Sequence, residues 1–99
     1  MSVATVTIQI GNSDDKLSQR RWHEFTFAFK RFLDESNGKI HFFGFSASDA
    51  PWQSCCAVID EPENLIEFES TLAALAWFFD QDSIALTAGT TQFVEASNG

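Results

Sequence analysis

The chain has 99 residues, which suits one domain and excludes two, and its 44% apolar residues, with eleven Phe and three Trp, can build a hydrophobic core. Charged residues make up 20% of the chain, so the composition typical of disorder is excluded. Fourteen acidic against six basic residues give a net charge of −8, which argues against nucleic acid and favours a protein partner with a basic surface.

The first half of the chain predicts a strand, a helix and a second strand. Apolar and polar residues alternate over 3–10, as in a half-buried strand, and turn residues fill 11–16. Ser18 can cap the helix, and Asn37-Gly38 ends it. Its apolar face consists of Trp22, Phe25, Phe29, Phe32 and Leu33. Residues 39–45 form a predicted strand that is apolar on both faces.

The second half predicts a strand, a helix and one or two further strands. A loop over 46–54 leads into a strand over 55–59. Asp60 is expected to cap the second helix, with Glu63 closing a capping box. The apolar stripe of this helix consists of Leu65, Phe68, Leu72, Leu75 and Phe79. Residues 80–83 end it, a strand follows over 84–87, and a turn at 88–89 precedes a short fifth strand over 91–95.

The order β-α-β-β-α-β predicts an α+β domain with a ferredoxin-like sandwich, in which two helices cover one face of an antiparallel sheet. Residues 1–99 form this single domain, with 1–2 and 96–99 expected to be frayed. Because the strand over 39–45 is apolar on both faces, the second sheet face is covered either by the chain's own tail or by another molecule. A homodimer is one such arrangement.

The expected compartment follows from the first residues, the apolar stretches and the two cysteines. Residues 1–5 lack the basic region and apolar run of a signal peptide, and the longest apolar stretch, 72–79, is far short of a membrane span. Cys55 and Cys56 are adjacent, and successive side chains of a strand point to opposite faces, so a disulfide between them is not expected. The sequence therefore predicts a cytoplasmic protein with no membrane partner.

Several short segments resemble a small, functionally uncharacterised family of bacteria and their phages. They are Gly11 with Ser13-Asp14-Asp15, the pair Trp22-x-x-Phe25, and Phe79-x-Gln81-x-Ser83-Ile84. The resemblance spans most of the chain and implies a ferredoxin-like fold without a particular activity. The link to phages implies a protein that acts on a host factor.

In a ferredoxin-like sheet the loops over 11–16, 46–54 and 80–83 emerge at one edge, and loops on a rigid scaffold commonly carry function. This edge gathers carboxylates, amides, hydroxyls, one Lys and aromatic rings. The candidate binding residues are Asn12, Ser13, Asp14, Asp15, Lys16, Trp22, Asp49, Trp52, Gln53, Gln81, Asp82 and Ser83.

Three kinds of site fit these residues. An exposed Trp surrounded by Asp suits a basic protein partner. Amides and hydroxyls near a helix start suit a polar or nucleotide-like small molecule, although Asp14 and Asp15 oppose an anion there. Several carboxylates together suit Mg²⁺ or Ca²⁺, but their spacing matches no known metal loop, so no metal and no cofactor are predicted.

The histidines and cysteines form no recognisable catalytic set. His23 and His41 have no Ser, Cys or carboxylate at a familiar spacing, and nothing local lowers the pKa of Cys55 or Cys56.

The leading hypothesis is therefore a non-enzymatic binding module that acts through the loop edge, for example as an inhibitor of a host or toxin protein. A small-molecule binder is the first alternative, and it predicts a pocket lined by Trp22, Trp52, Asn12 and Gln81. A dimeric ferredoxin-like enzyme, with His41 or His23 as the base, is the second, and it requires a histidine that faces a cavity.

Overall fold

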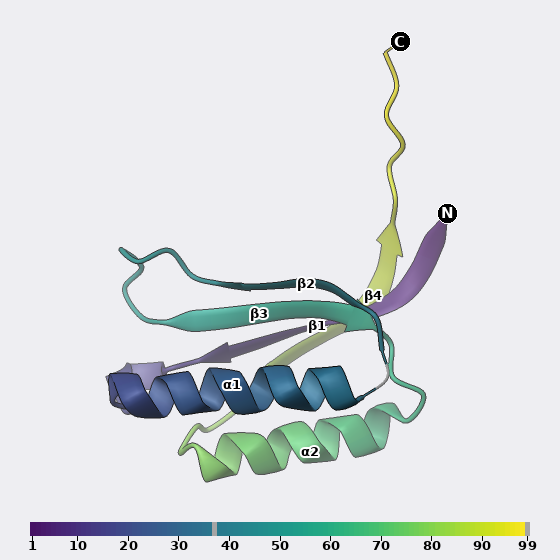
Figure 1. Cartoon of the computed structure of the whole chain (residues 1–99). Helices are drawn as coiled ribbons and strands as arrows, with labels where there is room; N and C mark the ends of the chain where they lie inside the picture. Colours follow the sequence, from purple (N-terminus) through teal and green to yellow (C-terminus); the bar gives the residue numbers. More distant parts are fainter. Residues whose placement is uncertain (37, 99) are drawn as a thin grey trace.

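The computed structural model describes residues 1–36 and 38–98. Its elements are β1 (Ser2–Gly11), the 3-10 helix η1 (Ser13–Asp15), α1 (Gln19–Glu35), β2 (Ile40–Phe45), β3 (Ser54–Asp60), α2 (Leu65–Phe78) and β4 (Ala85–Gln92). The strands form one antiparallel sheet in the order β2-β3-β1-β4, with both helices on the same face (Figure 1). The predicted ferredoxin-like sandwich is confirmed. We call the sheet face turned away from the helices the open face.

The hydrophobic core lies between the sheet and the two helices. Val6 and Ile8 of β1 and Phe25 and Phe29 of α1 are completely buried there, as the alternating and helical patterns predict. The rings of Phe25 and Phe79 stack with their centroids 4.7 Å apart, which joins α1 to the end of α2. Within the described residues, neither helix is long and apolar enough to cross a membrane.

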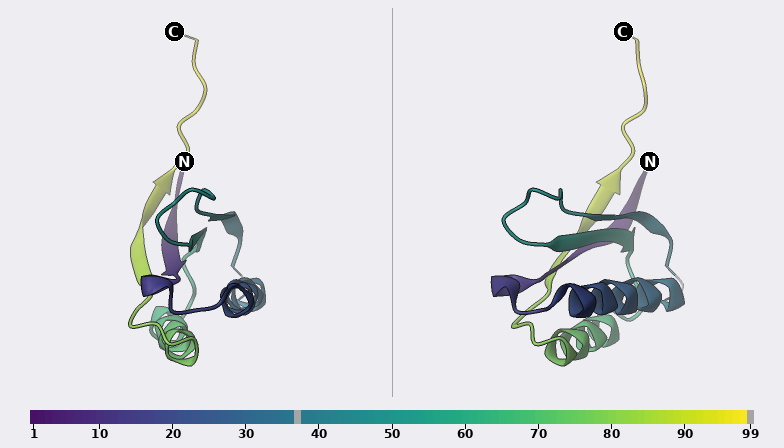
Figure 2. Two further views of the ribbon diagram at one scale, coloured as in Figure 1. Left: turned by 90° about the vertical axis from the view of Figure 1, so that its left-hand side faces the viewer. Right: turned by 60° about the vertical axis from the view of Figure 1, so that its left-hand side comes forward.

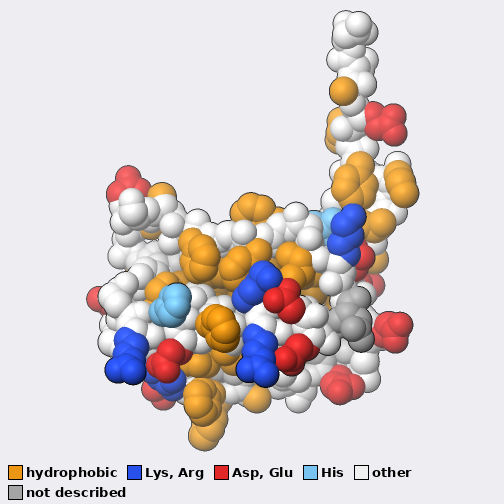
Figure 3. Space-filling model, viewed as in Figure 1, with side chains coloured by type: hydrophobic (Ala, Val, Ile, Leu, Met, Phe, Trp, Pro, Cys, Tyr) orange, Lys and Arg blue, Asp and Glu red, His pale blue; other side chains and the backbone are white. Residues whose placement is uncertain are grey.

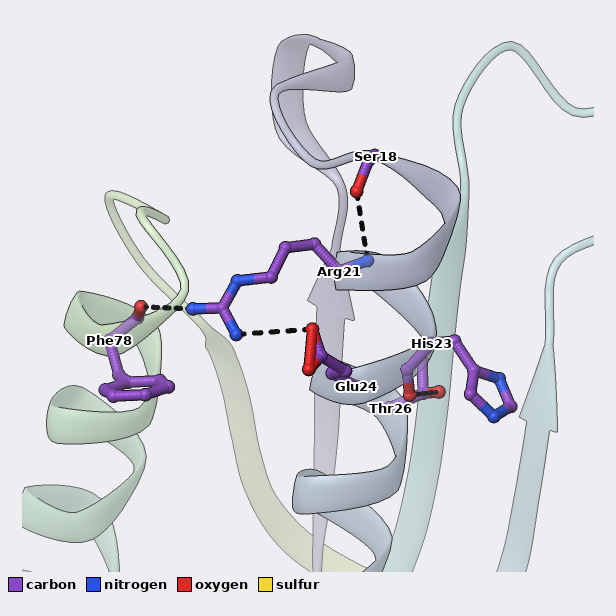
Figure 4. A network of polar contacts seen from close by, with 6 residues as sticks. All are labelled: Ser18, Arg21, His23, Glu24, Thr26 and Phe78. Atoms are coloured by element: carbon purple, nitrogen blue, oxygen red, sulfur yellow. Dashed lines mark hydrogen bonds and ion pairs between the residues drawn. The ribbon is translucent and has the colours of Figure 1, made fainter.

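The start of α1 matches the prediction and is tied to the end of α2. Ser18 Oγ accepts a hydrogen bond of 3.1 Å from the backbone N–H of Arg21 (Figure 4). The Arg21 guanidinium donates to the Phe78 carbonyl at 3.2 Å and lies 4.4 Å from the centroid of the Phe79 ring. A cation over an aromatic face stabilises this junction by roughly 0.5–1 kcal/mol.

The start of α2 differs from the prediction that Asp60 caps it. Asn64 is the cap, because its Oδ1 accepts from the Glu67 N–H at 3.0 Å, and its Nδ2 donates to the Glu67 carboxylate at 3.3 Å. Asp60 is instead the last residue of β3, where its carboxylate lies 2.7 Å from Nε2 of His41. The strand thus extends one residue further than expected, and 61–63 form the connection.

The end of α2 is a left-handed cap built on an aspartate. Asp80 has φ of 58°, and its N–H donates to the Trp77 carbonyl at 3.2 Å while the Gln81 N–H donates to the Ala76 carbonyl at 2.9 Å. These two bonds form a Schellman motif, in which glycine is the usual left-handed residue. For the first helix, Asn37 of the predicted end lies outside the described residues, and α1 ends at Glu35 with Ser36 as its cap.

The C-terminal strand is one continuous element, so the predicted turn at 88–89 and a separate fifth strand are absent from the described residues. β4 pairs with β1 without a break from Ala85↔Gln9 to Gln92↔Ser2. The reason is the length of β1, whose ten residues offer partners to every residue of β4. Beyond β4 the chain extends away from the body of the protein (Figures 1 and 2).

Candidate functional site

The three loops predicted at one sheet edge do lie together, at the end of the sheet opposite the chain termini (Figure 1). We call them the loop edge, which comprises residues 11–16, 46–54 and 80–83. Asn12 Nδ2 donates to Gln53 Oε1 at 3.2 Å, and the Ser13 N–H donates to Gln81 Oε1 at 3.1 Å. These bonds connect all three loops, so the prediction of their shared position is confirmed.

Asn12 is completely buried and connects the parts of the loop edge. Its Oδ1 accepts from the Leu17 N–H at 2.8 Å, and its Nδ2 donates to the Leu17 carbonyl at 3.0 Å and to the Asp15 carboxylate at 3.3 Å. Its backbone N–H donates to the Gln53 carbonyl at 2.9 Å. The side chain is fully used within the chain, so Asn12 holds the loops together rather than lining a ligand pocket.

Gln81 and Trp22 are also buried. Gln81 Nε2 donates to the Phe79 carbonyl at 3.1 Å, which, with the bond to Ser13, fixes the end of α2 against η1. Trp22 meets Phe25 edge to face, with ring centroids 5.9 Å apart. Both residues therefore shape the loop edge from inside.

The solvent-facing part of the loop edge is acidic and carries one exposed indole. Its exposed polar residues are Ser13, Asp14, Asp15, Lys16, Ser48, Asp49, Asp80, Asp82 and Ser83. Trp52, in the same loop as Ser48 and Asp49, is 63% exposed. Lys16 lies 3.9 Å from Asp82, and a surface ion pair of this kind contributes about 1 kcal/mol or less. The carboxylates outnumber this single cation, so the surface suits a basic partner.

The η1 turn holds two consecutive residues in the left-handed region. Asp14 has φ of 56° and Asp15 has φ of 54°, a conformation that Asp tolerates better than most side chains. Backbone bonds from Asp15 to the Asn12 carbonyl at 3.1 Å and from Lys16 to the Ser13 carbonyl at 3.2 Å keep the turn closed. The two exposed carboxylates therefore project from a fixed backbone.

A hollow of about 290 Å³ opens beside the loop between β2 and β3. It is lined by three aromatic residues, Trp22, Phe45 and Trp52, together with Gln53 and the small residues of 46–54. Pockets for drug-sized ligands hold ~300–1,000 Å³, so this hollow is at the lower limit. Of the pocket predicted for a small molecule, Trp22 and Trp52 share this hollow, whereas Asn12 and Gln81 do not line it.

Two residues that contact the loop edge, Gln19 and Phe45, are not among the site residues predicted from the sequence. Gln53 Nε2 donates to Gln19 Oε1 at 2.7 Å, and Gln19 Nε2 donates to Gln53 Oε1 at 3.1 Å. Phe45, the last residue of β2, directly precedes the predicted loop over 46–54, and Gln19, the first residue of α1, lies three residues after the predicted loop over 11–16. Extending the predicted loops by a few residues would have included both.

Neither histidine lines the hollow beside Trp52. His23 is exposed on α1, and its backbone carbonyl accepts from the Thr26 hydroxyl at 2.9 Å (Figure 4). His41 pairs with Asp60, in the part of β3 farthest from the loop edge. None of the five cavities described for residues 1–36 and 38–98 is lined by either histidine, so none of these five is the histidine-lined cavity that the enzyme hypothesis requires.

In the part of the chain that the structure describes, Cys55 is an unreactive thiol and the acidic residues form no metal-binding cluster. Burial, and to a smaller degree the neighbouring Cys56, raises the pKa of the Cys55 thiol to about 11, which keeps it protonated and unreactive. Both cysteines are free, and Cys56 is half-buried. Within the described part of the chain, no group of three or more His, Cys, Asp and Glu side chains could hold a metal ion.

Comparison with known proteins identifies the fold and goes no further. No protein-family model and no curated protein matches the chain significantly. A formyltetrahydrofolate deformylase from Pseudomonas syringae pv. tomato str. DC3000 aligns over 89% of this chain with a TM-score of 0.59 and 17% identity, and the aligned part is 28% of the deformylase. A hydroxynitrile lyase from Passiflora edulis aligns over 95% of this chain and 98% of its own, with a TM-score of 0.54 and 8% identity. These two likenesses show the ferredoxin-type fold alone.

Proposed function

We propose that this chain is a non-enzymatic binding domain that recognises a protein with a basic surface through the exposed part of the loop edge. A phage- or bacterium-encoded inhibitor of a host or toxin protein would work in this way. The observation that carries the proposal is the exposed ring of Trp52, which lines an aromatic hollow in a loop that also carries Asp49.

The exposed Trp52 supports protein binding because indoles are favoured anchors of protein interfaces. Fully burying a large apolar side chain stabilises a protein by roughly 1.5–3 kcal/mol. Trp52 is 63% exposed, so much of this stabilisation is available to a partner that covers the ring. The hollow beside it offers a partner side chain contact with Trp22 and Phe45 at the same time. A cationic side chain placed there gains attraction from the ring faces and from Asp49 nearby in the loop.

The arrangement of polar groups supports a preformed surface. Hydrogen bonds from Asn12 to Gln53 and from Ser13 to Gln81 already join the three loops. The loops therefore lose little conformational entropy when a partner docks. The exposed carboxylates can steer a basic partner during its approach. Association is therefore expected to slow as salt concentration rises.

Two exposed indoles that line different hollows provide a matched test. Trp52 lines the aromatic hollow, whereas Trp77, 80% exposed on α2, lines a hollow with Lys16, Asp80 and Asp82 instead. Wild type, Trp52→Ala and Trp77→Ala are immobilised, and proteins captured from a lysate of the encoding organism are quantified by mass spectrometry. The proposal predicts a partner that is retained by Trp77→Ala and lost by Trp52→Ala. Equal capture by wild type and Trp52→Ala would refute it.

Small-molecule binding is the second candidate, and the hollow between Trp22 and Trp52 favours it. Native mass spectrometry of the purified protein tests it, since a bound ligand adds a mass that denaturation removes. The Trp52→Ala variant should lose that mass if the hollow is the site. We place either function in the cytoplasm, which the two free cysteines support.

A further inference from the structure

The open face of the sheet carries small, apolar and hydroxyl side chains. The register of the strands places one set of alternating residues on it, including Thr5, Thr7, Phe42, Cys56, Val58 and Thr87. The side chain of Phe42 is more than half exposed. The strand over 39–45 is apolar on both faces, which predicts that both faces of the sheet are covered. Within the described residues, helices lie over only one face of the sheet.

Charge is almost absent from this sheet. The four strands contain one formally charged residue, Asp60, which pairs with His41 at the end of β3. Every other carboxylate and cation of this −8 chain lies in a helix, a loop or a terminal segment. The open face is therefore the broad surface that a second acidic molecule can approach with the least repulsion.

The open face is also concave along the strands. Residues 2–4 of β1 pair with 90–92 of β4 beyond the first β1–β3 pair, which is Thr5↔Asp60, and this two-stranded ribbon rises away from the helices (Figures 1 and 2). At the other end the loop between β2 and β3 rises on the same side. Figure 3 shows the resulting saddle in profile. Phe93 and Val94, which follow the ribbon, are exposed beyond it.

We infer that the open face seats a second copy of this chain, sheet against sheet, with the ribbon of each copy beside the other. Packed sheets lie ~10 Å apart, and a further ~10 Å separates each sheet from its helices, so the charged side chains on the helices of the two copies stay beyond the ~8 Å Debye length. A basic partner, in contrast, is attracted by the carboxylates of the loop edge and gains little from a face whose one carboxylate, Asp60, already pairs with His41. The charge distribution therefore favours a second copy here.

The size of the open face suits such a pairing. Four strands ~4.8 Å apart and about seven residues long, at ~3.4 Å each, give a footprint of roughly 450 Å² before side-chain relief is counted. Side chains that project from the sheet, and the ribbon with Phe93 and Val94, add to this flat area. The buried surface thus approaches the ~800 Å² per partner of a standard interface. This inference concerns a surface other than the loop edge and does not depend on the proposed function.

A pair of substitutions on the same strand tests the inference. Thr87 lies on the open face and Thr90 on the opposite face, and both are exposed, so Lys is tolerated by the monomer at either position. Sedimentation equilibrium is expected to find a dimer for wild type and Thr90→Lys. Thr87→Lys should raise the dimer Kd by about 100-fold or more, because it buries unpaired positive charge between the sheets.

The thiol of Cys56 provides a second, independent measurement. It lies on the open face, whereas Cys55 points into the core, so a thiol reagent at pH 8 reports on Cys56. Its labelling rate should fall as the protein concentration rises, and Thr87→Lys should abolish this dependence. A monomer at all concentrations with a constant labelling rate would overturn the inference. A dimer that both Lys variants weaken, or that neither weakens, would overturn it as well, since it would use another surface.

Discussion

Replacing Asn12 with Ala should destabilise the protein far more than a loop substitution usually does. The side chain is completely buried, and it bonds both the N–H and the carbonyl of Leu17, which is itself buried. A buried polar group that loses its partner costs about 1–3 kcal/mol, so the two Leu17 groups together predict a loss of about 2–6 kcal/mol. Small domains have only about 5–15 kcal/mol of stability, and the melting temperature should fall by roughly 10 °C or more.

Urea denaturation followed by tryptophan fluorescence measures this loss, since Trp22 is buried in the folded state. Asn64→Ala is the control, because Asn64 is an exposed helix cap whose removal costs about 1 kcal/mol. If Asn12→Ala costs no more than Asn64→Ala, Asn12 is not the connector of the loop edge. Its side chain would then be free to contact a ligand, as the sequence first suggested.

Three further predictions concern stability, pH and the exposed surface. Asp80→Gly should stabilise the protein by about 0.5–1 kcal/mol, measured by urea denaturation, because glycine accepts the left-handed cap conformation without strain; a loss of stability would contradict this. The pKa of Cys55 is raised from 9.0 to about 11, so the unfolded chain releases this proton first and stability should fall from pH 9 to pH 11. The stability of Cys55→Ala should fall less between pH 9 and pH 11 than that of wild type. An equal fall would show that Cys55 is not the cause of the pH dependence. Trp52→Ala should change stability by less than ~0.5 kcal/mol, because the ring is mostly exposed; a large loss would give Trp52 a structural role.

Much of the fold could be predicted because periodicity and capping act locally. The alternation around Val6 and Ile8 and the Ser18 cap each depend on neighbours in sequence, and the structure confirms them. The start of α2 could not be predicted in this way. Both Asp60 and Asn64 are good caps, and the choice between them depends on His41, nineteen residues away from Asp60, which holds Asp60 in the sheet.

The same reasoning explains the error at the C-terminus and the partial success at the loop edge. Gly89 was expected to mark a turn, but pairing with the long β1 keeps β4 straight through it. Topology alone predicted that the three loops meet, and they do. Topology could not predict that Asn12 and Gln81 are buried while Trp52 is exposed. The burial of loop side chains depends on contacts between loops, which the order of elements does not specify.

The central claim, that the loop edge is the binding surface, is tested most directly by hydrogen exchange of the chain with and without the protein it captures. The account predicts slower exchange of the amides in 46–54 and 11–16 on binding, with the outer face of α2 unchanged. Protection confined to α2, or to the open face of the sheet, would contradict it.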